Sequence, residues 1–122
     1  MTAVLADVSY PNYGNTNTIS ATGTFNYNPV AHGQVTMITL TNATTVTFGA
    51  PTGIVEGAMF KFILKAGDTS NRSFAWSSNF KFPSGVAPLT YGTTNSGAYD
   101  IITFLGGPTN TLIYDGKVQD VR

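Results

Sequence analysis

The sequence predicts an all-β protein, an antiparallel β-sandwich of jelly-roll type or a related barrel with an extended N-terminal segment. Short stretches that alternate between apolar and polar residues recur along the chain. Gly, Pro and Asn clusters separate them about every ten residues, and no stretch has the periodicity of an amphipathic helix. About six or seven such strands indicate a sandwich or barrel. We expect residues 1–30 to form an N-terminal arm or edge strands, and residues 31–122 to form the sandwich.

Two strand-like stretches open the predicted sandwich. Residues 34–40 are rich in β-branched side chains, but their alternation shifts between Met37 and Ile38, where we expect a β-bulge. Residues 44–48 alternate without a break. The short link that begins at Asn42 predicts a hairpin turn between the two.

Three later stretches supply the predicted core. Alternation in residues 59–65, 72–76 and 99–104 places large apolar side chains on one face of each strand. In the first of these strands, Met59 and Ile63 fall on the opposite face. The predicted core residues are Phe60, Phe62, Leu64, Phe74, Trp76, Ile102 and Phe104.

A closing hairpin is predicted at the end of the chain. Residues 111–115 form a strand-like stretch that ends at Asp115-Gly116, a dipeptide typical of tight hairpin turns. We expect residues 117–121 to return as a short strand.

The N-terminal segment differs from the rest because residues 9–33 contain no Asp, Glu, Lys or Arg. Its aromatic side chains require burial, which distinguishes it from a disordered tail. It forms either edge strands of the domain or an arm that becomes ordered on a neighbouring subunit. The candidate subunit-contact residues are Tyr10, Asn12, Tyr13, Phe25 and Tyr27.

Charge and composition exclude several classes of function. Charged residues make up 10% of the chain and their formal net charge is zero, so no basic surface for nucleic acid is expected. No apolar stretch is long enough to span a membrane, and the first residues lack a signal-peptide pattern. We therefore expect synthesis in a cytoplasm and no membrane partner. There is no cysteine, which excludes disulfides and thiol chemistry.

The titratable residues do not predict a catalytic site. His32 is the only histidine, and it has no acidic residue nearby in the sequence. The six carboxylates are spread singly, without the spacing of a metal site or a paired acid. Asp100 shares a face with Ile102 and Phe104, so we expect an inward, structural carboxylate. No enzyme activity, cofactor or metal is predicted.

From residues 46–48 onward, the order of elements resembles a β-sandwich module of tailed-bacteriophage virion proteins. The resemblance covers roughly the last 85 residues. The matching elements are residues 46–48, Gly57, residues 60–64, residues 74–76, the KFPSGVAPLT loop at 81–90, residues 100–104 and residues 114–116. In such modules the loop is an ordered connection that closes one end of the sandwich. The N-terminal segment has no counterpart.

The resemblance implies a structural virion protein, and we expect a capsid decoration (cement) protein at the capsid surface. Its partners would be the major capsid protein and other copies of itself, as a homotrimer that bridges capsid subunits. The chain is short and lacks the heptads or shaft repeats of a fibre. The alternative is a receptor- or carbohydrate-binding domain of a tail fibre or baseplate. There the aromatic residues from Trp76 to Tyr91 would face a host glycan.

Overall fold

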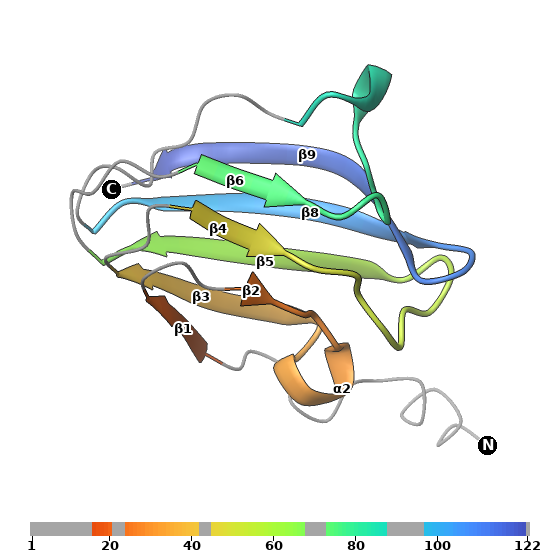
Figure 1. Cartoon of the computed structure of the whole chain (residues 1–122), viewed down its shortest axis with the longest axis horizontal. Coiled ribbons are helices and arrows are strands. Elements are labelled where there is room, and N and C mark those ends of the chain that lie inside the picture. The colour runs from red at the N-terminus through yellow and green to blue at the C-terminus, as the bar shows by residue number, and fades with distance from the viewer. Residues whose placement is uncertain (1–15, 21–23, 42–44, 68–72, 88–96, 122) are drawn as a thin grey trace.

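The protein is an all-β sandwich of two packed sheets, which confirms the predicted fold class (Figure 1). The computed structural model describes residues 16–20, 24–41, 45–67, 73–87 and 97–121. A six-stranded sheet has the order β1-β3-β5-β8-β9-β7, and a three-stranded sheet has the order β2-β4-β6. The strands are β1 (Thr16–Ser20), β2 (Thr24–Phe25), β3 (Val35–Thr41), β4 (Thr45–Phe48), β5 (Met59–Ala66), β6 (Ser73–Trp76), β7 (Phe80–Lys81), β8 (Tyr99–Gly107) and β9 (Thr111–Val121).

The first six strands wind alternately through the two sheets. β1, β3 and β5 are parallel neighbours in the larger sheet, while β2, β4 and β6 are parallel neighbours in the smaller one. Each pair of successive strands therefore forms one coil, and three coils stack on each other. This stacking brings equivalent residues into register, such as Phe25, Phe48 and Trp76.

The predominance of parallel pairing corrects the antiparallel pairing that the sequence suggested. Among the described strands, antiparallel pairing occurs between β5 and β8 and between β8 and β9. The hairpin expected at Asn42 is wrong, because β3 and β4 lie in different sheets. Residues 42–44 themselves lie outside the described part.

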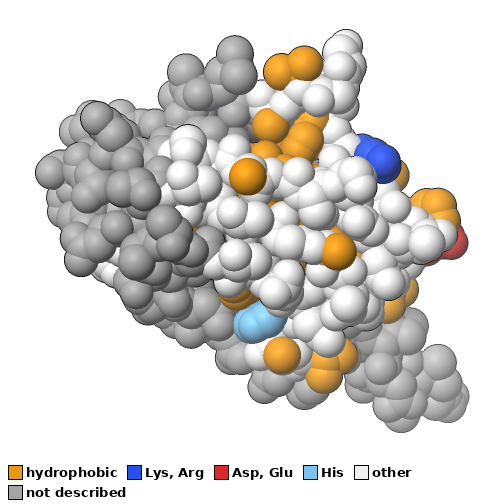
Figure 2. Space-filling model, in the orientation of Figure 1, with side chains coloured by type: hydrophobic (Ala, Val, Ile, Leu, Met, Phe, Trp, Pro, Cys, Tyr) orange, Lys and Arg blue, Asp and Glu red, His pale blue; other side chains and the backbone are white. Residues whose placement is uncertain are grey.

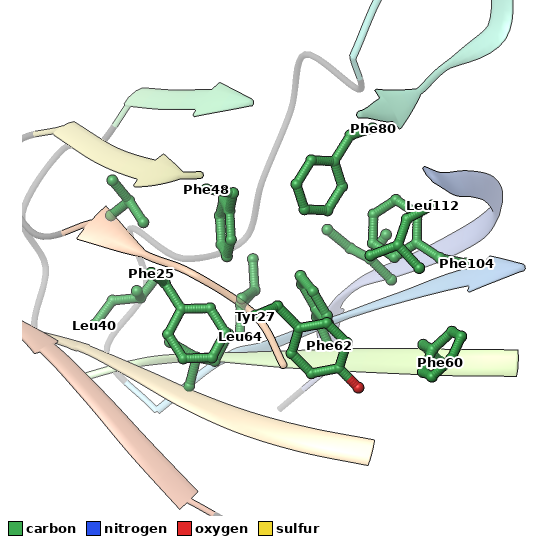
Figure 3. Close-up of a cluster of buried hydrophobic side chains, with 13 residues drawn as sticks. Phe25, Tyr27, Leu40, Phe48, Phe60, Phe62, Leu64, Phe80, Phe104 and Leu112 are labelled. Carbon is green, nitrogen blue, oxygen red and sulfur yellow. The ribbon is translucent and has the colours of Figure 1, made fainter. Parts of the chain in front are cut away.

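Aromatic and aliphatic side chains fill the space between the sheets (Figure 3). Phe62 lies near the middle, with the rings of Tyr27, Phe104 and Phe48 at centroid distances of 4.8, 5.3 and 5.6 Å. The predicted core is confirmed: Phe60, Phe62, Leu64, Ile102 and Phe104 are fully buried, and Phe74 and Trp76 pack against them while partly exposed.

Two local predictions on the remaining strands are wrong. β3 alternates without a bulge, because Thr36 takes an inward position and Met37 points outward. The Asp115-Gly116 pair lies inside β9 instead of at a turn, at an irregularity in its pairing with β8. The chain turns instead between β8 and β9, where Thr109 and Asn110 adopt positive φ angles of 57° and 54°. Asn adopts this left-handed backbone region more readily than most residues do.

The described part of the N-terminal segment belongs to the sandwich. β1 and β2 are edge strands of the two sheets, followed by the short helix α2 (Pro29–His32). Phe25 and Tyr27 lie in the protein's own core, 7% and 0% exposed, where a neighbouring subunit cannot contact them. The prediction that these two side chains contact a subunit is therefore wrong. The other candidate contacts, Tyr10, Asn12 and Tyr13, lie outside the described residues.

Candidate interaction surface

The side of the six-stranded sheet that points away from the core is unusually apolar for a surface. On β3, β5 and β8, even-numbered residues point inward and odd-numbered residues point outward. The register of the strands arranges the outward side chains in rows across the sheet. We call the surface formed by the outward side chains of β3, β5, β8 and β9 the outer face.

One row crosses all four strands. Met37 on β3 pairs with Ile63 on β5, which pairs with Ile101 on β8, which pairs with Val118 on β9. Cross-strand neighbours on one face are in side-chain contact distance. These four residues therefore form a continuous apolar stripe.

A second apolar row lies nearer one end of the sheet. Met59 on β5 pairs with Leu105 on β8, which pairs with Ile113 on β9. Of the seven exposed large hydrophobic residues in the described part, Met59, Ile113, Val118 and Val121 belong to this face. Apolar side chains gathered in this way mark interaction sites more often than single exposed ones do.

Charges on the outer face are few and stand at defined places. Lys61 lies between the two apolar rows on β5, and the exposed Asp115 lies at the same level on β9. β8 separates them, with Thr103 between. Lys65 places its ammonium group 5.8 Å from the centre of the Tyr99 ring, a cation–π arrangement within the chain.

The opposite side of the molecule has a different character. The outward residues of the three-stranded sheet are small and neutral: Thr24, Thr45, Thr47, Ser73 and Ala75. The hydroxyls of Thr45 and Ser73 lie 3.3 Å apart across neighbouring strands. Figure 2 shows this side, where the visible charged side chains of the described residues lie toward the rim.

Asp100 is buried on the inner face of β8, as predicted, next to Ile102. Lys117 pairs in register with Ile102, and the negative charge of Asp100 acts on it. Burial lowers the pKa of Lys117, and Asp100 opposes that shift. A buried carboxylate with a cation beside it is a structural arrangement, since isolated buried charge is costly.

His32 serves the local structure of α2. The backbone N–H of Asn28 donates to its Nδ1 atom over 3.1 Å, and its ring lies 4.6 Å from that of Phe25. Burial lowers the pKa of His32 below its ordinary value, which favours the neutral imidazole. The side chain of Asn28 accepts from the Val30 N–H and caps the helix.

The aromatic residues around the KFPSGVAPLT loop lie against the core. The Trp76 ring stacks on Phe48 at a centroid distance of 4.2 Å, and Phe82 meets Trp76 at 5.3 Å and Tyr114 at 5.7 Å. The turn at Ser84-Gly85 has positive φ angles of 55° and 72°. These contacts hold the described beginning of the loop, 81–87, at the open edge of β6.

No group of acidic or histidine side chains within the described ranges could hold a metal ion. None of the helices there is long and apolar enough to cross a membrane. No protein-family model, curated protein or solved structure matches this chain.

The sequence did not predict the outer face as a surface, although part of its pattern was present. Alternation placed Met59 and Ile63 opposite the core. Their neighbours on β8 and β9 became apparent only with the register, because residues such as Ile63 and Val118 are far apart in the chain.

Proposed function

We propose that this protein is a structural component of a phage virion, a capsid decoration protein that acts by binding other proteins. The observation that supports an assembly role is the outer face, with its two apolar rows across β5, β8 and β9. The virion assignment rests on the resemblance described above. The partners are the major capsid protein and other copies of this chain.

Such a protein would work by bridging. Removing apolar area from water on both sides of a subunit boundary opposes separation of the subunits. The low charge supports this role, because near-zero net charge favours association. The neutral face of the three-stranded sheet adds a second surface with little charge to repel a partner.

The test uses particles assembled in cells that make the wild-type protein, the Ile63→Lys variant or neither. We expect the wild-type protein in purified particles at a copy number comparable to that of the major capsid protein. Ile63→Lys places a charge in the apolar row and should lower its occupancy. Thr52→Lys, the same kind of added charge at an exposed loop position outside both sheets, is the matched control.

Three outcomes would contradict the proposal. Absence from purified particles would refute a virion role. A copy number matching the tail proteins, together with binding on a glycan array, would favour the receptor-binding alternative. Equal occupancy of wild type and Ile63→Lys would exclude the outer face as the binding surface.

A further inference from the structure

We propose that the partner on the outer face is a second copy of this chain, packed face to face about a two-fold axis that runs along β8. This inference rests on the proposed assembly function and specifies the partner of that surface. It follows from the arrangement of β5 and β9 on either side of β8.

The two strands that flank β8 present matched side chains at each level. Met59 and Ile113 flank Leu105 at one level, and Ile63 and Val118 flank Ile101 at another. Each level therefore carries a large apolar residue on both sides of the central strand.

Between these two levels the flanking strands carry charges of opposite sign, Lys61 on β5 and Asp115 on β9. Lys61 on β5 and Thr103 on β8 pair in register, and Thr103 pairs with Gly116, the residue after Asp115. Within one chain the two charges are two strand spacings apart, about 10 Å, with β8 between them. Among the described residues neither Lys61 nor Asp115 has an ion-pair partner.

A two-fold rotation about β8 exchanges the two flanking strands. It lays β5 of one copy over β9 of the other and keeps every level unchanged. Met59 then faces Ile113 of the second copy, and Ile63 faces Val118 of the second copy. Lys61 faces Asp115 of the second copy, so the charges that are separated within a chain are brought opposite each other between chains.

The central strand fits the same arrangement, and the remaining charges lie away from the axis. Two sheets packed face to face keep their strands nearly aligned at about 10 Å, which suits an axis along a strand. Ile101 and Leu105 on β8 lie on the axis and face their own equivalents. Lys65 already lies over Tyr99, and β3 adds no charged side chain on its outward positions. The exposed Lys81 on β7 lies beside Ile113, outside the four strands of this face.

This geometry gives a dimer in place of the trimer expected from the resemblance. A two-fold contact uses the same patch on both copies, whereas a threefold ring needs two different patches. The levels on β5 and β9 are complementary to each other about one strand, which is the self-complementary pattern of a two-fold.

The test measures the mass of the full-length chain across a concentration series by sedimentation equilibrium. We expect a wild-type dimer. Lys61→Glu alone and Asp115→Lys alone each create two like-charge contacts per dimer and should weaken dimerisation by at least about tenfold. A 1:1 mixture of the two variants should restore the dimer, because each unlike pair then has opposite charges at both contacts. Glu56→Lys, an exposed charge change outside this face, should leave the dimer unchanged.

The mixing step keeps the test independent of folding, because misfolded variants could not rescue each other. A wild-type chain that stays monomeric, a mixture that does not restore the dimer, or a wild-type trimer would overturn the inference. The wild-type chain could be monomeric and present in virions, with its occupancy lowered by Ile63→Lys. That result would leave the proposed function standing and show that another protein binds the outer face. A dimer that is absent from virions would support the inference and refute the proposed function.

Discussion

Trp76 lies flat on Phe48, with ring centroids 4.2 Å apart and ring planes 11° from parallel. The two residues pair in register between β6 and β4, so the contact joins the second and third coils. Phe80 packs against Trp76 in an edge-to-face arrangement, with ring centroids 5.0 Å apart and ring planes inclined by 63°. One face of the indole is thus covered by the core. The aromatic rings beside the Pro83–Gly85 turn therefore lie there because they pack on the core.

Replacing Trp76 with Ala should lower the free energy of unfolding by about 3 kcal/mol, the lower end of the range for large aromatic residues. The lower end applies because Trp76 is partly exposed. Urea denaturation followed by circular dichroism measures this loss. Ala75→Ser, on the outward side of the same strand, should change it by less than about 0.5 kcal/mol. An unchanged midpoint for Trp76→Ala would contradict the core assignment.

Removing Lys117 should destabilise the fold through Asp100. Lys117→Met leaves the buried carboxylate without the cation that acts on it, and we expect a loss of up to about 1 kcal/mol because water screens the largely exposed Lys117. Adding Asp100→Asn should recover part of that loss, because the charge that Lys117 acts on is then absent. A double-mutant cycle of unfolding free energies gives the coupling, with the exposed Glu56→Gln as a neutral control. Simple additivity of the two changes would show that the charges do not interact.

The stability of the protein should decrease as the pH falls below neutral, in part through His32. The folded state lowers the pKa of His32, so the unfolded chain takes up a proton at a higher pH than the folded chain. The contribution of His32 is complete above its unfolded pKa of about 6.5 and is lost as the pH falls toward its folded pKa. His32→Gln should reduce the slope of unfolding free energy between about pH 7.5 and pH 5.5. Equal slopes in both proteins would refute this role.

Sequence alternation predicted which side chains enter the core but not which strands are neighbours. Phe60, Phe62 and Leu64 alternate strictly, and that pattern holds in any sheet with one buried face. Parallel coils could not be predicted, because Thr16 and Met37 or Met37 and Ile63 become neighbours only through register over long separations.

Local turn signals misled for the same reason. Asp115-Gly116 favours a hairpin by itself, but pairing with β8 continues through it to Val121. The bulge expected near Met37 rested on the assumption that an apolar side chain must point inward. Instead Thr36 is buried, and Met37 contributes to the outer face. The candidate surface consists of such outward apolar residues, so it could not be recognised before the sheet order was known.

The last prediction concerns residues 1–30, which the sequence analysis set apart from a sandwich expected at residues 31–122. Deleting residues 1–30 removes both β1 and β2 together with Phe25 and Tyr27, which lie in the core. It also removes the Tyr27 hydroxyl that donates to the Gly33 carbonyl, and Asn28, which caps α2. Loss of a single buried aromatic residue costs about 3–5 kcal/mol, so loss of two approaches the whole stability of a small domain.

We therefore expect the 1–30 deletion to give a chain without a cooperative thermal transition, measured by circular dichroism. Deleting residues 1–14 leaves every described contact in place and is the matched control, which should keep the transition. Phe25→Ala in the full chain should fall between the two, with a lowered melting temperature. A cooperatively folded 31–122 fragment would show that the first coil is dispensable and that Phe25 and Tyr27 add little to the core.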